Sequence, residues 1–433
     1  MRTEWLMNLE HQKMRVYVNL RKTVYKIKYK RFHPEYSMSH ITFYSAGNAG
    51  DTALSTCIRD LFNKEVGRIS WSLTSMVKPV NNKYIESMNR KSAIVVGGHG
   101  AFMPDTNENQ ISGWEWACSK EQYGQISLPI IVFAIGYNYF TGQTRETVFE
   151  ENVQALVKRS DFFGLRNRGS VRLVQSLVDE SLKSKVEYQP CPTMIARNLY
   201  PMLPDKVETG KVAFNVALDR AKMRMGTNQD VILDEIAKSM YLLSLRGYEM
   251  HFVTHCDTEI PFTEYLKKYD VKYKLHSASS WGASKLIAFY NKMDVVVGMR
   301  GHGIWIPFGV NCHIISLGNQ NKTKWFLEDI NALDWYIDIN ENPHGLCNQI
   351  IEKFIYLHEV NGSDTTRRLL EEQNKLYMIT MENMKKIKKV INPTVGYGRA
   401  GSGCVGGLVG GGVIFCNIAY GFALCFFGQI LAL

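Results

Sequence analysis

Between about residues 39 and 393, short runs of β-branched and aromatic residues alternate with stretches of helical periodicity. This alternation is typical of βαβ units, in which parallel strands are joined by crossover helices. Helices are expected around residues 53–62, 232–245 and 285–290, where apolar positions recur with helical spacing. Strands are expected at residues 41–44, 94–96, 130–135 and 162–163, and again at 212–216, 250–254, 294–299 and 313–317.

These two sets of strands predict an α/β protein with two Rossmann-like domains that face each other across a cleft, a GT-B-like architecture. Pro201, Pro204 and Gly210 indicate a linker between the two sets. The predicted boundaries are a basic N-terminal arm over 1–38, an N-terminal domain over 39–200, a C-terminal domain over 201–363, one or two closing helices over 364–400, and an apolar glycine-rich tail over 401–433.

In the first set, each strand ends in glycine or a polar residue. The loops that follow contain residues 47–51, 97–100 and 136–138, and the fourth strand leads to Arg166. Open α/β sheets bind ligands beyond the carboxyl ends of their strands. We therefore expect these four segments to converge on one crevice.

The formal charge of +10 is unevenly distributed along the 433 residues. Residues 1–34 hold nine Lys or Arg against two Glu, which leaves only +3 for the rest. Such an arm could bind an anionic surface, which is either a membrane or nucleic acid. The alternative is a solvated N-terminal helix with no such partner. Because the body is nearly neutral, we expect no nucleic-acid partner. No apolar segment follows the early basic residues as a secretory signal would require.

The last thirty residues, 404–433, contain no Asp, Glu, Lys or Arg. Thirty residues are enough to cross a bilayer as a helix, so one reading is a membrane anchor behind a cytoplasmic catalytic part. The other readings are a poorly ordered tail or a truncated final segment. Nine scattered cysteines without a C-x-x-C pair predict reduced thiols and no structural zinc, and no metal-ligand spacing is visible.

Three segments have residues suited to an anionic ligand or to proton transfer. Arg300-Gly301-His302 follows an apolar strand, where an arginine and a histidine can bind phosphate or carboxylate and supply a proton. A structural ion pair is the alternative. Asp51 opens a helix, where it either caps the helix or contacts a substrate hydroxyl as a base. Arg166 offers a second anion contact, with plain surface charge as the alternative.

The ordered motifs resemble the polysaccharide pyruvyl transferase family. The similarity runs from about residue 41 to 333 and rests on Gly-Asn-Ala-Gly-Asp at 47–51, the glycines at 97–98, Ile-Gly-Tyr at 135–137, Arg166, and Arg300 with His302. It implies transfer of pyruvate from phosphoenolpyruvate onto a sugar as a ketal. It also implies donor binding and catalysis by an arginine near Arg166 and by the Arg-x-His motif. Two positions depart from the family pattern: Asn167 stands where Asp is common, and Gly301 where Leu is common.

On this resemblance we expect phosphoenolpyruvate as co-substrate, no other cofactor, no metal, and a glycan acceptor. His302 is the expected acid and Asp51 a hydroxyl contact or base. Arg166, Arg300 and the main chain of Gly301 are expected to bind the donor, and Asn48, His99 and Tyr137 the acceptor. His99 has a structural alternative. Trp114, Trp116, Tyr137 and Tyr139 either stack on a sugar ring or belong to the core, and the core is the expected place for all four. The competing functions are a nucleotide-sugar glycosyltransferase of the same architecture and a catalytically silent, membrane-associated sugar-binding protein.

Overall fold

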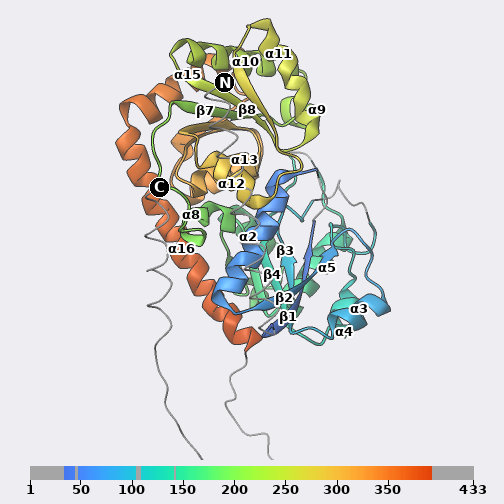
Figure 1. Cartoon of the computed structure of the whole chain (residues 1–433). Helices are drawn as coiled ribbons and strands as arrows, with labels where there is room; N and C mark the ends of the chain where they lie inside the picture. Colours follow the sequence, from blue (N-terminus) through green and yellow to red (C-terminus); the bar gives the residue numbers. More distant parts are fainter. Residues whose placement is uncertain (1–33, 44–46, 104–108, 141–142, 393–433) are drawn as a thin grey trace, which may run out of the picture. The chain divides into compact units, whose positions relative to one another are not determined.

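A computed structural model describes residues 34–43, 47–103, 109–140 and 143–392 of this protein (Figure 1). The apolar tail and all but the end of the basic arm lie outside these ranges. The expectations for both ends, including membrane association, therefore stay predictions. No helix within the described ranges is long and apolar enough to cross a membrane.

Two six-stranded sheets, parallel throughout, form the framework (Figure 1). The first has the order β2-β1-β3-β4-β5-β6. Its strands are β1 (Tyr36–Thr42), β2 (Ile69–Ser75), β3 (Ala93–Gly97), β4 (Ile130–Ile135), β5 (Phe162–Leu165) and β6 (Val186–Tyr188). The second has the order β12-β11-β10-β7-β8-β9, with β7 (Lys211–Asn215), β8 (Glu249–Thr254), β9 (Tyr273–Ser277), β10 (Val295–Gly298), β11 (His313–Gly318) and β12 (Tyr336–Asp338).

The strand order of each sheet reverses at one point. In the first sheet the order reverses between β1 and β3, so that later strands are added on the other side of β1. In the second sheet it reverses between β7 and β10. Doubly wound nucleotide-binding folds have switch points of this kind. The predicted α/β fold with two Rossmann-like halves is confirmed. One boundary differs from the prediction, because β1 begins at Tyr36 and residues 36–38 belong to the sheet rather than the arm.

Helices cover both faces of each sheet. In the first half they are α2 (Ala49–Glu65), α3 (Asn82–Met88), α4 (Lys120–Gln125), α5 (Thr147–Arg159), α6 (Arg168–Gln175), α7 (Glu180–Lys183) and α8 (Ala196–Leu199). In the second half they are α9 (Ala221–Met225), α10 (Gln229–Leu245), α11 (Thr263–Lys268), α12 (Ala283–Tyr290), α13 (Gly301–Gly309), α14 (Asn321–Asp329) and α15 (Leu346–Phe354).

The inner strands of the first sheet are buried on both faces. In β3, Ile94 and Val96 join the core cluster beneath α3, α4 and α5, while Ala93 and Val95 join the cluster that contains α2. Side chains of a strand point alternately to opposite faces, so a strand covered on both sides is apolar at every position. The cluster that contains α2 also includes the core residues of the second sheet, so it is continuous between the two halves of the molecule.

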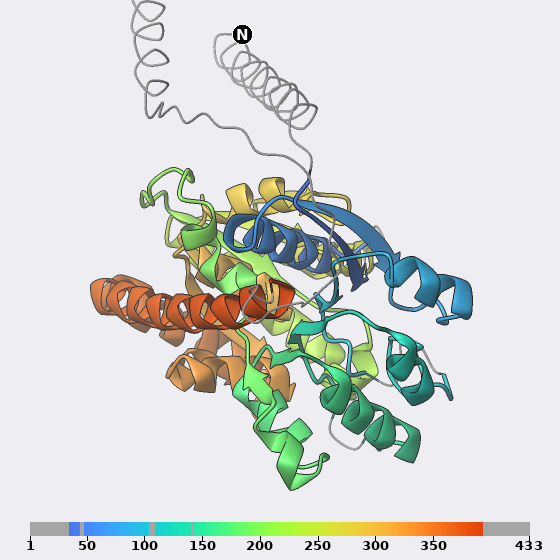
Figure 2. The ribbon, with the colours of Figure 1, turned by 90° about the horizontal axis from the view of Figure 1, so that it is seen from below.

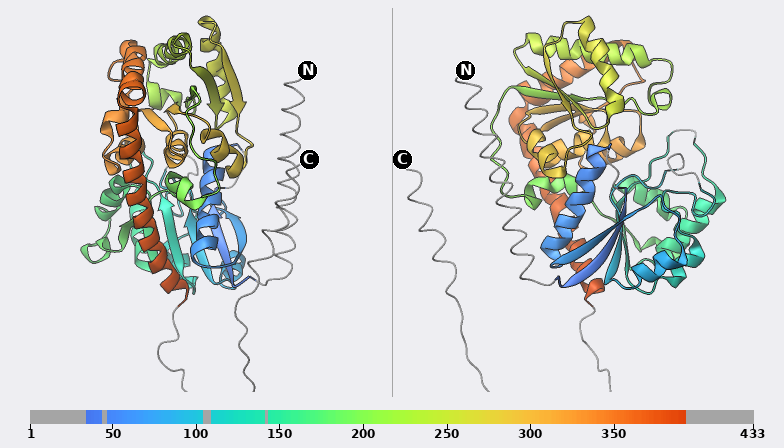
Figure 3. Two further views of the ribbon diagram at one scale, coloured as in Figure 1. Left: turned by 60° about the vertical axis from the view of Figure 1, so that its left-hand side comes forward. Right: turned by 45° about the vertical axis from the view of Figure 1, so that its right-hand side comes forward.

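Helix α16 (Gly362–Ile391) spans both halves and is one continuous helix (Figures 1 and 3). Near its start, Arg368 donates to Asp334 of the second half at 2.8 Å. Near its end, Nδ2 of Asn383 donates to the carbonyl of Tyr188 in the first half at 2.8 Å. Seen from below, α16 lies beside α2 (Figure 2). The helix therefore ties the two sheets together on the side away from their loops.

Candidate active site

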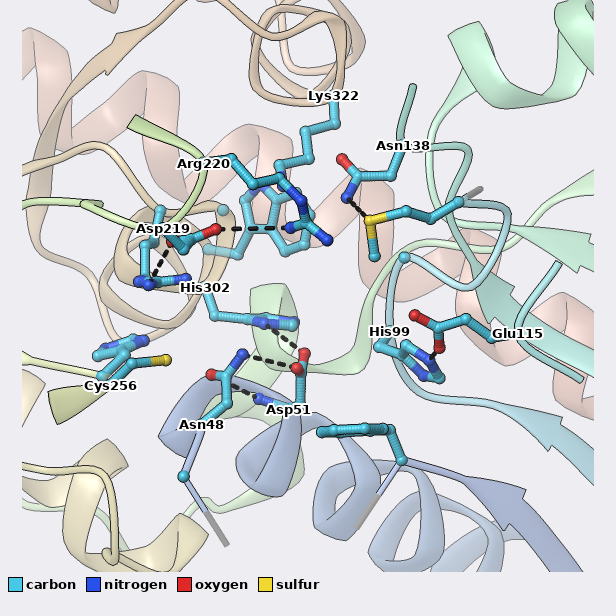
Figure 4. Close-up of a pocket in the computed structure, with 18 of the residues that line it drawn as sticks. Asn48, Asp51, His99, Glu115, Asn138, Asp219, Arg220, Cys256, His302 and Lys322 are labelled. Carbon is cyan, nitrogen blue, oxygen red and sulfur yellow. Dashed lines mark hydrogen bonds and ion pairs between the residues drawn. The ribbon is translucent and has the colours of Figure 1, made fainter. Parts of the chain in front are cut away.

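The predicted convergence of loops is confirmed by a pocket of about 380 Å³ between the two halves (Figure 4). Its first wall includes Asn48, Asp51, His99, Glu115, Asn138 and Arg166, and its second wall includes Asp219, Arg224, Arg300, His302, Trp305 and Lys322. The loops after β1, β3, β7 and β10 all contribute. These are the strands at which the two sheets reverse their order, so both switch points open into the same pocket.

Asn48, not Asp51, caps helix α2. The Asn48 side chain accepts from the backbone N–H of Gly50 at 3.0 Å, and its own Nδ2 donates to Oδ2 of Asp51 at 2.6 Å. The capping alternative for Asp51 is therefore wrong. With the helix capped by its neighbour, the Asp51 carboxylate is available to face the pocket. Burial raises the pKa of this carboxyl above its ordinary value.

His302 lies in the first turn of α13 and meets Asp51 across the cleft. Its Nδ1 is 3.5 Å from Oδ1 of Asp51 (Figure 4). Its Nε2 is 4.0 Å from Sγ of Cys191. Its ring packs edge-on against Trp305, with the ring centres 4.9 Å apart. Burial, reinforced by the positive charges of Arg166 and Lys322, holds the pKa of His302 well below its ordinary value. This shift favours the neutral form of the ring at pH 7.

Arg300 is held by carboxylates on both sides. Its Nε donates to Glu259 and its Nη2 to Oδ1 of Asp219 at 2.5 Å, and the Glu259 side chain is fully buried. Asp219 also pairs with Arg224 at 3.0 Å. Arg300 lines the pocket, but the structural ion pair foreseen as its alternative role is present. Its contact with a donor stays a prediction.

Arg166 and Lys322 differ from Arg300 in their surroundings. No hydrogen bond or ion pair joins either of them to another residue in the described part of the chain. Arg166 lies over the Trp305 ring at 4.6 Å, and its buried Nε lacks a partner. Burial lowers the pKa of Arg166 to about 10, and burial together with Arg224 and Arg166 lowers that of Lys322 well below its ordinary range. Both shifts indicate positive charge that is not compensated.

His99 and Glu115 form a buried ion pair on the first wall, between Nε2 and Oε2. Their side chains are 5% and 3% exposed, so the pair is removed from solvent although both residues line the pocket. The pKa of His99 is raised because Glu115 outweighs the cost of burial. Among the described histidines of the pocket, His99 is therefore the one whose pKa is raised, while the pKa values of His255 and His302 are lowered.

Comparison with known proteins supports the fold first. The structure is similar to a protein from Listeria monocytogenes assigned as a UDP-N-acetylglucosamine 2-epimerase, with a TM-score of 0.53, 9% identity, and coverage of 83% of this chain and 97% of that one. A UDP-GlcNAc 2-epimerase from Neisseria meningitidis aligns over 83% and 100% of the two chains at 12% identity, with a TM-score of 0.49. No curated protein sequence matches this chain significantly.

The sequence model of the polysaccharide pyruvyl transferases matches residues 48–321, which include almost all of the pocket. The chain belongs to this family. Family membership supports a transferase that modifies a glycan. Lys322 lies one residue beyond the matched span.

Both departures from the polysaccharide pyruvyl transferase pattern have a local explanation. The side chain of Asn167 accepts from the backbone N–H of Ser170 at 2.7 Å and caps α6, a task that Asn and Asp perform equally well. At Gly301, an added Cβ would come within 2.9 Å of the Trp305 ring. Glycine here makes room for Trp305, which fills the space beside His302.

Tyr137 does not line the pocket. Its ring stacks on Tyr139 with the centres 4.5 Å apart and packs against Phe149, because the backbone after β4 turns this side chain toward α5. The acceptor contact expected of Tyr137 is therefore not supported by its position. Trp114 and Trp116 are fully buried, which confirms the core interpretation for both. Asn48 and His99, in contrast, do line the pocket.

Five charged residues that line the pocket were missed from the sequence: Glu115, Asp219, Arg220, Arg224 and Lys322. Asp219 and Lys322 follow β7 and β11, so the rule that ligands bind beyond strand ends was a usable signal for them. Glu115 lies between two buried tryptophans in a loop without periodicity, and nothing in its neighbourhood indicates a site. Within the described ranges, no group of three or more His, Cys, Asp or Glu side chains could hold a metal ion.

Proposed function

We propose that this protein transfers the pyruvyl group of phosphoenolpyruvate onto a sugar of a glycan as a cyclic ketal and releases phosphate. The observation that carries the proposal is the pair formed by Arg166 and Lys322. Within the described ranges neither of these two pocket cations has a carboxylate partner, whereas Arg300 and Arg224 are paired. A phosphate placed between them would compensate both charges in a site of low dielectric, where such contacts are strongest.

The same pocket supplies groups for the proton transfers. His302 protonates the methylene carbon of the donor, and the adjacent carbon then accepts the first sugar hydroxyl. Asp51 takes the proton of that hydroxyl and returns it to His302, whose Nδ1 is 3.5 Å away. The second hydroxyl displaces the phosphate, and its proton leaves with the phosphate. Each proton removed from the sugar is thus accounted for.

The neutral state of His302 in the empty pocket is consistent with this role. Arg166 and Lys322 contribute to the low pKa of the ring, and the anionic donor would offset their charge. Donor binding would therefore raise the pKa of His302 and load it with a proton. The acid would be charged only when its substrate is present.

The pocket is also consistent with a sugar acceptor on the first wall. Asn48 and Asp51 offer polar groups to hydroxyls, and Phe43 is an aromatic ring on the same wall. An aromatic face of this kind suits the apolar face of a sugar ring. We assign the acceptor to this wall and the donor phosphate to the second wall, beside Lys322.

The test is donor binding by calorimetry and by thermal shift, on the full chain. We expect phosphoenolpyruvate to bind, and Arg166→Ala or Lys322→Ala to weaken its binding at least tenfold. Lys324→Ala is the matched control, because Lys324 lies on the same helix α14 but is exposed and outside the pocket. Binding of UDP-sugars in place of phosphoenolpyruvate would overturn the proposal in favour of a glycosyltransferase. Phosphate release on addition of candidate glycans then identifies the acceptor.

A further inference from the structure

The His99–Glu115 pair is the part of the pocket that the proposed chemistry does not yet use. Nε2 of His99 is engaged by Glu115, but Nδ1 has no partner among the described residues. The residue is 4% exposed and follows β3, at the switch point of the first sheet. A buried N–H that is left without an acceptor costs free energy, so its persistence at a pocket wall indicates a ligand atom as the missing partner.

The charges around His99 come from several elements. Glu115 and Asp51 favour its protonated form, and Arg166 opposes it. His40 and His302 lie near enough for His99 to depress their pKa values, and both are neutral. The ring of Phe43 covers His99 at 5.8 Å. Among the described residues only Glu115 makes a direct ion pair with the imidazole, so its carboxylate is the main group that raises the pKa of His99.

We propose that Glu115 is a positioning residue that keeps His99 cationic, so that the Nδ1–H of His99 donates to the carboxylate of the donor. This inference rests on the proposed function and adds a residue to it. The donor has two anionic groups, and Arg166 with Lys322 accounts for the phosphate. Because Arg300 is already paired with Glu259 and Asp219, the carboxylate needs another cation. His99 is on the wall opposite Lys322, where it can meet that end of the donor (Figure 4).

An ion-paired histidine suits this task better than proton transfer. A base must be neutral before it acts, and Glu115 holds His99 in its charged form. The charge would also help the reaction, because a carboxylate held by His99 does not quench the positive character that develops at the neighbouring carbon. The pair therefore separates binding from acid–base work: His99 binds, while His302 and Asp51 move protons.

The experiment compares donor affinity in the wild type and in Glu115→Gln from pH 5.5 to 8.5. Without the carboxylate, His99 loses its proton at neutral pH, so we expect the Kd of Glu115→Gln to exceed that of the wild type about tenfold at pH 8, a difference of roughly 1.4 kcal/mol. The ratio of the two Kd values should shrink as the pH falls and His99 is protonated again. Taking the ratio at each pH cancels the titration of the donor itself.

Two variants serve as controls. Glu249→Gln removes a carboxylate from His251, a His–Glu pair outside the pocket, and should leave the affinity unchanged at every pH. His99→Gln keeps an N–H donor without a charge and should weaken binding by a similar factor at every pH. If Glu115→Gln does not fold, Glu115→Asp replaces it, with a smaller defect of the same pH dependence expected.

A direct readout is the ¹⁵N spectrum of the histidine rings in the full chain without ligand. His99 should show the imidazolium signature at pH 8 in the wild type and the neutral one in Glu115→Gln. A ratio of Kd values that is independent of pH, or a neutral His99 in the wild type, would overturn the inference. Failure of the proposed function looks different, because the wild type would then not bind phosphoenolpyruvate at any pH.

Discussion

Nδ1 of His302 lies 3.5 Å from Oδ1 of Asp51, and the two residues come from opposite halves of the molecule. Asp51 is in the first turn of α2, which follows the first sheet's switch point, and His302 is in the first turn of α13, which follows the second's. Neither half has both groups. The proposed proton-transfer pair therefore requires both halves to be docked, and any change that separates them should impair catalysis before it unfolds the protein.

The absence of a side chain at Gly50 allows α2 to come close to His302 of α13. A Cβ on Gly50 would lie 2.6 Å from Cβ of His302 and 2.8 Å from its Nδ1, so Gly50→Ala should push α2 and α13 apart. We expect a loss of at least tenfold in kcat and about 1–3 kcal/mol of stability, as for an overpacked core. Steady-state kinetics and urea unfolding check both.

Gly124→Ala is the matched control. Gly124 lies in α4 with nothing within 4 Å of an added Cβ, so alanine there should stabilise the protein by about 0.5–1 kcal/mol and leave kcat unchanged. Wild-type activity in Gly50→Ala would show that the close approach of α2 to His302 is not required for the reaction.

Donor binding should be coupled to proton uptake at His302. In the empty pocket burial and the charges of Arg166 and Lys322 lower the pKa of this histidine, and an anionic donor offsets those charges. Binding must then take up a proton at any pH between the free and the bound pKa, and affinity must fall as the pH rises through the bound value. Calorimetry in buffers of different ionisation enthalpy measures the proton uptake. It is done at pH 8 because the phosphate of the donor, with a pKa of about 6, is then fully ionised and takes up no proton itself.

His302→Gln is the variant for this measurement, because it removes the titrating group and keeps a polar side chain. Its proton uptake should be close to zero. If the wild type and His302→Gln take up the same number of protons, a group other than His302 is protonated when the donor binds.

The ion pair of Arg300 with Glu259 should be structural as well as functional. Glu259 is fully buried and also accepts from the backbone N–H of His255 at 2.8 Å. Glu259→Gln leaves Arg300 with Asp219 alone, and removing one partner of a buried pair costs on the order of 3 kcal/mol. Urea unfolding measures the loss. Glu264→Gln, in an exposed pair with Lys267, should change the stability little. Equal effects of the two substitutions would contradict a buried structural pair.

Asp329 should make stability fall with rising pH. Its Oδ2 accepts from the backbone N–H of Arg168 at 3.0 Å, which joins α14 to the start of α6, and burial raises its pKa to about 7. The unfolded chain has an ordinary aspartate, with a pKa of about 3.9. Between these values the folded state binds more protons, so stability decreases as the pH rises from about 4 to about 7 and is level above.

Asp329→Asn removes this titration and keeps the hydrogen-bond acceptor. Thermal unfolding from pH 4 to 9 should show the Asn variant more stable than the wild type at pH 8 and nearly equal to it at pH 4. Asp270→Asn, an exposed aspartate paired with Lys272, is the control and should leave the pH profile unchanged. A wild-type slope that persists in Asp329→Asn would assign the pH dependence to another group.

All eight strands expected from the sequence exist, and they are the inner strands of the two sheets: β1, β3, β4 and β5, and β7, β8, β10 and β11. The four that were missed, β2, β6, β9 and β12, are the edges. Val295 and its neighbours in β10 are buried at every position, whereas β9 is half exposed. A strand covered on both faces is an unbroken apolar run, but an edge strand is mixed in polarity and resembles a loop.

The fold class, the family and the loops of the pocket could be predicted from the sequence, because each depends on local patterns: apolar periodicity, glycines at strand ends, and ordered motifs. Which charges have a partner of opposite sign became visible only in the folded protein. Arg300 and Lys322 cannot be told apart by their neighbours in the chain, yet Arg300 is paired with Glu259, 41 residues away, and Lys322 has no ion-pair partner in the part of the chain that the structure describes. The charge state of a buried group is set by what lies within a few ångströms in space, and long-range contacts between the two halves supply those neighbours.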